Sequence, residues 1–455
     1  MQNNHSYRRG MCLPAAITVA IASLLAILAP HRAIAQRARA EAPPLVLGTL
    51  YDASRRDSPR VSAARSLARA ARARIAPAKL PPDPQLQLGL MNYTVPGLRP
   101  MDPLGMTQLQ LMQMVPVAGK LGLAGRVASA QASAEAERSN DMEWEVRADV
   151  AMAFYDLYRA DRELAVSRET LRLLQEIRGT AESMYRVGEG RQADVLRSQV
   201  EIARMVEDTI RTTTMRTAMV ARLDALLDRR SATSPGEAML PRFPDAVPPL
   251  DSLLALADSA RPMVRAALRE VDAASARARL ARREIWPDLT LGVQYGQRAG
   301  EMGTERMGSL MVGAAIPVFA GRRQLRMREE EAAMREMAVA DLAAMRADTR
   351  ARLTESYADL ARARTLAALY RTTVIPQAEA TVSSALAAYR VGGVDFMTLL
   401  DDRMTVNRYR QELSALDAEQ GKAWAELEML TGRQLFDPNA IANPAAAAEA
   451  ARGDR

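Results

Sequence analysis

The residue types that carry most enzyme and metal chemistry are nearly missing from this 455-residue chain. Its only cysteine is Cys12 and its two histidines are His5 and His31, all within a leader that we expect to be removed. The rest of the chain has no thiol and no imidazole. Disulfides, Cys or His nucleophiles, Ser-His-Asp triads, haem ligation, and zinc or copper sites of these ligands are therefore excluded. Carboxylates remain, so magnesium binding stays open.

Three further patterns could suggest chemistry, and each has a simpler explanation. Gly188-x-Gly190-x-x-Ala193 resembles a dinucleotide fingerprint but follows a helical pattern instead of a strand. Gly119-Lys120 lacks the spaced glycine and the Ser or Thr of a phosphate loop. The 25 methionines occur mostly singly, which favours core filling over a copper site. We therefore expect no catalytic residue, no metal site and no cofactor.

The charge pattern does not favour a nucleic-acid partner. The chain has 61 basic and 54 acidic residues, a formal net charge of +7, and the two signs alternate along helical stretches. Nucleic-acid-binding proteins usually gather their basic residues on one face. The interspersed pattern is typical of solvated helix faces beside a coiled-coil seam, so we expect no nucleic-acid binding.

The first 35 residues have the three parts of a secretory signal peptide. Arg8 and Arg9 supply a positive start, Leu13–Ala29 is largely apolar, and Ala33-Ile34-Ala35 is a small-residue cleavage site. A membrane anchor is the alternative, which the short apolar run and the cleavage site disfavour. No other segment has about 18 consecutive apolar residues, so a membrane-spanning part of the mature chain would have to be a β-barrel.

The sequence repeats itself at long range. Five phrases recur in one order at nearly one offset, and they pair Ser58-Pro59 with Arg261-Pro262, Pro84–Gly89 with Pro287–Gly292, Val115–Gly119 with Ile316–Gly321, Tyr185–Gly188 with Tyr389–Gly392, and Leu223–Arg229 with Leu427–Arg433. Such self-similarity indicates a duplicated architecture. The resulting division is a signal peptide 1–35, a first repeat 36–235, a proline-rich linker 236–249, a second repeat 250–436, and an alanine-rich tail 437–455 that we expect to be disordered.

Each repeat begins with a short helical pattern (about 46–77 and 250–284) and continues with two strands. In the first strands, Leu86, Leu88 and Leu90 alternate with polar residues, as do Leu289, Leu291 and Val293. The second strands are Thr107–Val115 and Met307–Ile316. Runs of about 9–11 residues with one apolar face have the length that crosses a bilayer as a tilted strand. A soluble half-buried sheet is the alternative, and export favours the membrane.

A very long helix follows the strands in each repeat. No proline occurs from Gly119 to Tyr185, which at about 1.5 Å per residue predicts a helix on the order of 100 Å long. Its heptad seam consists of Val146, Val150, Ala153, Leu157, Ala160, Leu164, Ser167, Leu171 and Leu174. The second long helix (about 322–389) contains Pro376, which should kink it. Both end at a Tyr-Arg-Val-Gly phrase, whose glycine permits a tight reversal into a returning helix at about 191–229 or 396–431.

Exported strands, helical hairpins of this length and duplication together resemble the TolC family of outer-membrane efflux proteins. The phrases that carry the resemblance over about 45–435 are Pro84-x-Leu86, Gln113-x-Val115-Pro116-x-x-Gly119-Lys120, Tyr185-x-x-Gly188 with Asp194-Val195-Leu196, and Tyr389-x-x-Gly392 with Leu399-Leu400-Asp401. Each phrase is weakly specific, but their order recurs twice. The Gly119-Lys120 corner is most similar to the branch that serves heavy-metal and resistance-nodulation-division pumps.

The resemblance implies a mainly α-helical chain with a transmembrane β-barrel part. Three copies would join four strands each into a twelve-stranded barrel, and the duplicated helical hairpins would form a trimeric α-barrel in the periplasm. The homotrimer would be the passive outer-membrane channel of a tripartite efflux system. It would contact outer-membrane lipid, dock to a periplasmic adaptor protein and an inner-membrane pump, and export small molecules or metal ions without being an enzyme. The alternative is a periplasmic coiled-coil scaffold or adaptor without a barrel, which four bilayer-length strands disfavour.

The resemblance also implies two functional sites. The hairpin tips would dock onto the adaptor, and they contain Val187, Gly188, Glu189, Gly190, Val391, Gly392 and Gly393. Acidic side chains beyond the tips would constrict the pore, and the candidates are Asp194, Asp401 and Asp402. A ring of carboxylates in a narrow pore favours cations. By the repeat offset Asp194 matches Thr398 and Asp401 matches Arg197, so this ring would be thinner than the family's. A simple glycine turn and simple helix-start carboxylates remain the alternatives.

Overall fold

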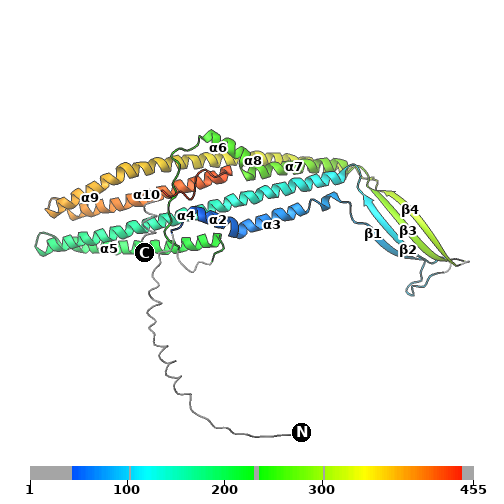
Figure 1. The fold of residues 1–455 in the computed structure, drawn as a ribbon, viewed down its shortest axis with the longest axis horizontal. Helices are drawn as coiled ribbons and strands as arrows, with labels where there is room; N and C mark the ends of the chain where they lie inside the picture. The colour runs from blue at the N-terminus through cyan, green and yellow to red at the C-terminus, as the bar shows by residue number, and fades with distance from the viewer. Residues whose placement is uncertain (1–43, 102–103, 230–234, 301–302, 443–455) are drawn as a thin grey trace, which may run out of the picture.

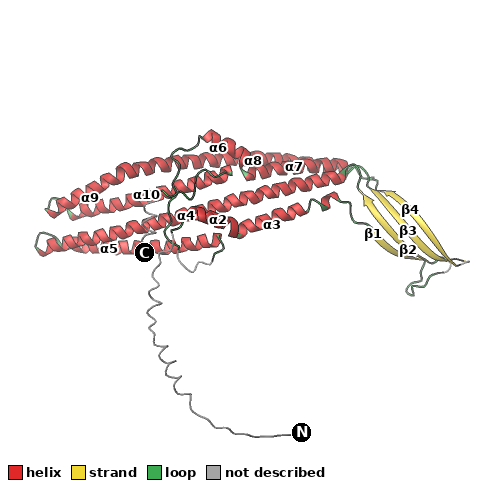
Figure 2. Ribbon diagram, viewed as in Figure 1, coloured by secondary structure: helices red, strands yellow, loops and turns green. Residues whose placement is uncertain are grey.

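A computed structural model describes residues 44–101, 104–229, 235–300 and 303–442. The molecule is elongated, with long helices side by side along one axis and a small sheet extending from one end of them (Figure 1). Figure 2 shows the strands gathered at that end, while the rest of the described chain is mainly helical. Among the described helices, none combines the length and apolarity needed to cross a membrane. The expected signal peptide, 1–35, lies outside the described residues.

Both halves contain helices and strands in the same order. The first half has α2 (Leu47–Asp57), α3 (Pro59–Ala73), β1 (Gln85–Met91), β2 (Met106–Val115), α4 (Lys120–Arg186) and α5 (Gln192–Leu226). The second half has α6 (Leu250–Ala260), α7 (Pro262–Arg283), β3 (Leu289–Gly300), β4 (Gly303–Ala314), α8 (Gln324–Leu369), α9 (Ile375–Arg390) and α10 (Phe396–Thr431). The patterns over 46–77 and 250–284 each predicted one helix and are instead two, because Pro59 and Pro262 each start a new helix.

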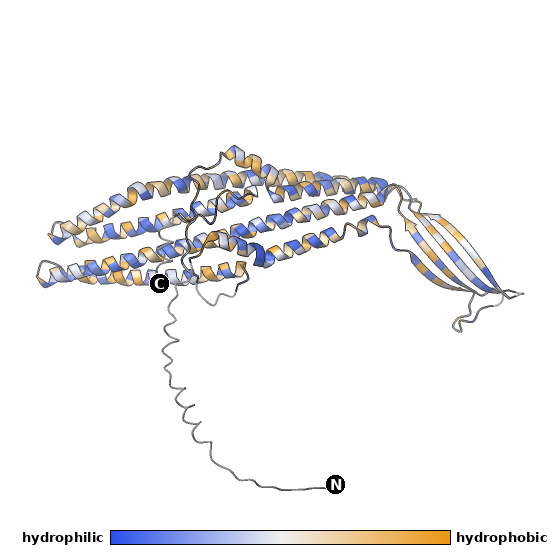
Figure 3. Ribbon diagram, in the orientation of Figure 1, coloured by the Kyte–Doolittle hydropathy of each residue, from blue (hydrophilic) through white to orange (hydrophobic). Residues whose placement is uncertain are grey.

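The four strands form one antiparallel sheet in the order β1-β2-β3-β4. Leu86 pairs with Leu111, Leu111 with Val293, and Val293 with Leu310. Because successive side chains point to opposite faces of a strand, these residues form one row across a single face, and all four are exposed. The hydropathy colours alternate along the strands accordingly (Figure 3). The predicted period-two pattern is confirmed, and its apolar face lies uncovered in the single chain.

The long helix predicted for the first half is α4. It has 67 residues, which corresponds to about 100 Å at 1.5 Å per residue. Of the predicted seam residues, all but Leu171 are buried, and Leu171 is partly buried. α4 packs against α5, α7 and α10, because small residues in the seam let several helices approach it closely.

The second long helix is interrupted where Pro376 predicted a kink. α8 ends at Leu369, Tyr370–Val374 form a π-helical segment, and α9 starts at Ile375 with Pro376 as its second residue. Proline has no N–H to donate and is tolerated in the first turn of a helix. The wider π turn thus gives the proline a position that behaves as a helix start.

A belt of irregular chain surrounds the middle of the helices. Linker residue Pro241 pairs with Ile441, and Leu45 pairs with Ala238. Residues 437–442, the start of the predicted tail, form backbone hydrogen bonds with the linker, while 443–455 lie outside the described residues. Beneath the belt lies the main apolar core, whose largest fully buried side chains include Trp424.

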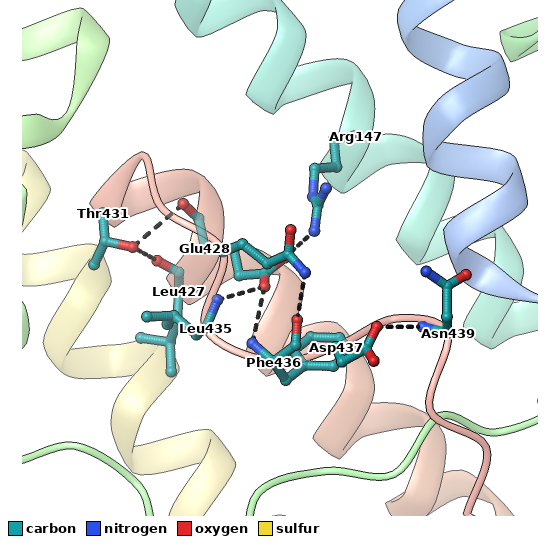
Figure 4. Close-up of polar contacts among 9 residues, drawn as sticks. Arg147, Leu427, Glu428, Thr431, Leu435, Phe436, Asp437 and Asn439 are labelled. Carbon is teal, nitrogen blue, oxygen red and sulfur yellow. Dashed lines mark hydrogen bonds and ion pairs between the residues drawn. The ribbon is translucent and has the colours of Figure 1, made fainter.

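Glu428 anchors the C-terminal part of this belt (Figure 4). Its Oε1 accepts hydrogen bonds from the backbone N–H groups of Leu435 and Phe436 at 2.7 and 3.4 Å, and its Oε2 lies 3.0 Å from Arg147 of α4. The Arg147 guanidinium also lies 3.8 Å from the centroid of the Tyr51 ring. Burial raises the pKa of Glu428, although Arg147 opposes this shift. One carboxylate thus connects α2, α4, α10 and the last described segment.

Candidate functional site

Both helical hairpins turn at the end of the molecule far from the sheet (Figure 1). Gly188 between α4 and α5 has φ +81°, and Gly392 between α9 and α10 has φ +73°. The hydrogen bonds of the two turns match residue by residue. In the first turn, Gly188 N donates to Tyr185 O at 3.1 Å and Glu189 N to Met184 O at 3.0 Å. In the second, the N–H groups of Gly392 and Gly393 donate to Tyr389 O and Ala388 O at 3.1 and 2.9 Å.

This pair of bonds is the Schellman motif, in which the residue after the helix end takes the left-handed conformation that favours glycine. The reversals predicted from the Tyr-Arg-Val-Gly phrases are therefore confirmed as turns. The structure places all seven predicted tip residues at these two hairpin ends.

The tips present small and mainly uncharged groups to solvent. Val187 is 71% exposed and Val391 is 82% exposed. Glu189 is exposed and is the only charged residue among the predicted tip residues. Such a surface suits close contact with another small-residue surface, and docking stays a prediction.

An apolar cluster directly behind the tips holds the two hairpins together. Its buried members come from all four tip helices and are Leu174, Ile177, Ala181, Met205, Ala385, Tyr389, Phe396, Leu399 and Leu400. The rings of Tyr389 and Phe396 meet edge to face with centroids 5.6 Å apart. The two matching tyrosines differ, because Tyr389 is 5% exposed whereas Tyr185 is 47% exposed.

Asp194 belongs to an acidic cluster at the tips that also contains Asp395 and Tyr389. Burial raises the pKa of Asp194, and the charge of Asp395 raises it further. The phenol oxygen of Tyr389 is buried and has no hydrogen-bond partner among the residues that the structure describes. The pKa of Tyr389 is raised by burial first and then by both carboxylates. The first hairpin supplies Asp194 and the second supplies Asp395 and Tyr389.

The sequence analysis missed Asp395. The side chain of this residue accepts a hydrogen bond from Met397 N at 3.2 Å and caps the start of α10. An aspartate between a glycine turn and an apolar helical run is a helix N-cap signal, so the position could have been recognised, although its proximity to Asp194 could not.

The other two predicted pore residues, Asp401 and Asp402, lie about two turns beyond Asp395 along α10. The side chain of Asp401 is exposed and that of Asp402 is partly buried. Within the described ranges, neither side chain takes part in an ion pair or a hydrogen bond. Both are thus available to a pore, and their role as a constriction stays a prediction.

A polar seam joins the two hairpins behind the apolar cluster. Arg410 of α10 lies 2.8 Å from Glu169 of α4 and bonds Glu379 of α9 through Nε at 3.0 Å. Arg403 is 6% exposed, and its Nε and Nη2 have no hydrogen-bond partner in the described part of the chain. Burial lowers the pKa of Arg403, and the charge of Arg410 lowers it further. A buried cation without a direct partner is costly, and the charges of Glu169 and Glu379, which raise the pKa of Arg403, offset part of that cost.

At the opposite end of the helices, Lys120 locks the strand-to-helix corner. Its side chain is 7% exposed, and Nζ donates to Trp286 O and to Asp288 Oδ1, both at 2.9 Å, and lies 3.3 Å from Glu284. The corner predicted around Gly119-Lys120 therefore joins the first half to the α7–β3 connection. The sequence phrase placed Lys120 at this corner but did not indicate which residues its side chain contacts.

Across the described ranges, His, Cys, Asp and Glu side chains form no group of three or more that could hold a metal ion. The site thus consists of turns, an apolar cluster and carboxylates, a set suited to contact and to ion passage.

Comparison with known proteins identifies the family. The family model described as "Outer membrane efflux protein" matches residues 50–229 and 253–433, well over half of the chain. A search of curated proteins gives no significant match. Among solved structures, the outer-membrane channel OprN is 19% identical with a TM-score of 0.73, covering 85% of this chain and 89% of that chain. VceC from Vibrio cholerae is 17% identical with a TM-score of 0.71, covering 86% and 97%. CusC is 16% identical with a TM-score of 0.73, covering 88% and 95%.

Proposed function

This chain belongs to the outer membrane efflux protein family and is an efflux channel of the outer membrane, and we propose that it works as a passive homotrimer. The observation that carries the trimer is the open sheet. β1 and β4 lack an outer partner in the described chain, and the leucine face is uncovered. An exposed strand edge seeks pairing, and three sheets of four strands joined edge to edge would close a twelve-stranded barrel in the bilayer.

The flanks of the helical body also support assembly. α5 exposes the apolar side chains Leu196, Val200 and Ile210, and α8 exposes Leu325 and Met337. Apolar side chains at helical spacing on an uncovered face usually mark a contact with another helix. In a ring of three copies, α5 of one copy would lie beside α8 and α9 of the next and form the trimeric α-barrel.

We further propose that the tips dock onto a periplasmic adaptor protein, which connects the channel to an inner-membrane pump. The matched Schellman turns and the exposed Val187 and Val391 support this role. Changing Gly188 or Gly392 to Trp should weaken adaptor binding in a pull-down and lower resistance in cells while trimers remain. Full resistance with both variants would contradict docking through these glycines.

Asp194, Asp401 and Asp402 are proposed to constrict the pore. Threefold symmetry turns each carboxylate into three, and a narrow mouth concentrates their field so that cations are favoured. Asp401→Ala should raise single-channel conductance in planar bilayers. Asp208→Ala is the control, because Asp208 lies on α5 and pairs with Arg211. Equal conductance of wild type and Asp401→Ala would remove Asp401 from the constriction.

The chain performs no covalent step in this proposal, because energy and substrate choice come from the pump, and the cargo is small molecules or metal ions. Residues 1–35 would direct export, and the boundaries 36–235, 236–249 and 250–436 would separate two repeats and their linker. Membrane fractionation tests the whole proposal. Recovery of the mature chain as a soluble periplasmic monomer would defeat it and favour a scaffold instead.

A further inference from the structure

Six arginines lie at helix ends that point toward the sheet (Figure 1). They occur as three pairs: Arg282 and Arg283 at the end of α7, Arg322 and Arg323 before α8, and, further from the sheet, Arg72 and Arg74 at the end of α3. We call this set the arginine collar. All six are exposed, and none of their side chains takes part in an ion pair or a hydrogen bond within the described ranges.

Other exposed arginines, such as Arg168 and Arg350, also have no ion pair within the described ranges, and the collar differs from them in lying at helix ends that point toward the sheet. Elsewhere the helical body pairs many of its arginines with carboxylates, as Arg147, Arg352 and Arg410 do. At the far end of the sheet, Arg298 is paired with Glu305 at 2.7 Å. Among nearby acidic residues, Glu284 and Asp288 interact with Lys120, and Glu329 pairs with Arg326. The collar arginines themselves have no ion pair within the described ranges.

Apolar side chains lie next to the collar and face solvent. Trp286 is 54% exposed and follows Arg282 and Arg283 closely, and Phe319 is 75% exposed and precedes Arg322 and Arg323. Trp286 lies three residues before β3 begins at Leu289, and Phe319 lies five residues after β4 ends at Ala314, so both flank the strands that carry the exposed apolar face. An aromatic beside the apolar band, followed by basic residues, is the order in which a membrane protein meets hydrocarbon, interface and headgroups.

We propose that the arginine collar binds the headgroups of acidic phospholipids in the periplasmic leaflet, with Trp286 and Phe319 placed at the level of the interface. This inference rests on the proposed function, in which the sheet spans the outer membrane. Guanidinium groups bind phosphate with two parallel hydrogen bonds, and a negative lipid surface attracts clustered basic residues near it.

The test uses the purified full chain in nanodiscs of mixed phosphatidylcholine and phosphatidylglycerol, with the lipids that remain bound after detergent extraction counted by native mass spectrometry. The collar variant changes Arg282, Arg283, Arg322 and Arg323 to Gln. The matched control changes four exposed arginines without ion pairs far from the sheet, Arg168, Arg172, Arg335 and Arg350, to Gln. A third variant replaces the four collar arginines with Lys.

The wild type and the control should retain phosphatidylglycerol several-fold over its share in the nanodisc, and the collar variant should fall to parity. The Lys variant should keep part of the enrichment, because the charge remains and the two-bond geometry is lost. Enrichment should fall with rising salt as screening increases. Equal enrichment in the wild type and the collar variant would overturn the proposal.

Other occupants give different results. If inorganic phosphate at constant ionic strength displaces the lipid completely, the collar is a free-anion site and the lipid proposal fails. If the collar variant alone loses its trimers in detergent, the collar is a contact between copies. If it alone changes the cation-to-anion selectivity of the channel, the arginines line the conduit. Each of these outcomes overturns the lipid proposal.

Channel conductance measured on the same preparations separates this inference from the proposed function. Absence of channels from the wild type would defeat the proposed function, whereas intact channels without lipid enrichment would defeat the collar alone.

Discussion

The two halves of this molecule contain the same elements but differ in continuity. The first half crosses the helical body with α4, which is uninterrupted over 67 residues. The second half covers the matching distance with α8, a π-helical segment and α9. The long helix of the first half is continuous, whereas that of the second half is interrupted by a π-helical segment. Duplication thus preserved the length of the hairpins and allowed their stiffness to diverge.

The two halves also differ in how firmly their strand-to-helix corners and their hairpin tips are packed. Lys120 in the first half is buried among three partners, whereas Arg322 at the matching position is exposed. Tyr389 in the second half is buried against Phe396, whereas Tyr185 is exposed. The first half is therefore fixed mainly at its sheet end, and the second half is fixed mainly at its tip. This contrast can be tested by exchanging features between the halves.

The largest effect is expected from giving the first half a proline. Arg172 of α4 occupies the position that matches Pro376 by the repeat offset, and its exposed side chain has no ion pair within the described ranges. Arg172→Pro should destabilise the protein by about 3 kcal/mol or more, since α4 lacks the π turn that accommodates Pro376. The midpoint of chemical unfolding in detergent measures this, with Arg172→Ala as the control. Equal midpoints for Arg172→Pro and Arg172→Ala would show that α4 is jointed too.

A smaller loss is expected at the corner. Lys120→Met removes the cation that Asp288, Glu284 and Trp286 O share, and unpaired groups in such a setting cost roughly 1–3 kcal/mol. Arg322→Met should change the same unfolding midpoint little, because the Arg322 side chain has no ion pair or hydrogen bond to lose among the described residues. If both substitutions had the same effect, the corners would not distinguish the halves.

The tips should respond more weakly and unequally to added methyl groups. A Cβ on Gly190 would lie 2.8 Å from Tyr185 N, whereas one on Gly393 would lie 3.5 Å from Ala388 O. Gly190→Ala should therefore cost about 1 kcal/mol or more through overpacking, and Gly393→Ala should be close to neutral. Hydrogen exchange at the two turns reports the difference. Equal protection in both variants would indicate that the turns are interchangeable.

The smallest effect concerns pH. Because the pKa of Asp194 is raised in the folded protein, its contribution to tip stability increases as pH falls through that pKa and is lost as pH rises above it. Asp395→Asn keeps a residue that can cap α10 but removes the second-largest cause of the shift. The pH midpoint of tip protection from exchange should then move lower, while burial keeps it above the ordinary aspartate range. Asp402→Asn serves as the control, and an unmoved midpoint in Asp395→Asn would separate the two carboxylates.

Local signals in the sequence predicted much of the fold. The alternation around Leu88 and Leu109 located strands, the seam from Val146 to Leu174 located a long helix, and the glycine phrases located both turns. Each of these depends on neighbours within a few residues. The partners of Lys120, the meeting of Asp194 with Asp395, and the pairing of Ile441 with Pro241 join residues far apart in the chain. No periodicity records such contacts, so they emerged only from the structure.

The irregular belt around the helices determines where the last described residue, Ala442, lies. Ala442 N donates to Leu240 O at 3.0 Å, so the last described residue is fastened at the waist, between the two working ends. A fluorescent reporter or an affinity tag fused directly after Ala442 would therefore start at mid-length. Such a fusion should leave both the sheet and the hairpin tips unobstructed, which makes Ala442 a suitable place to attach a label.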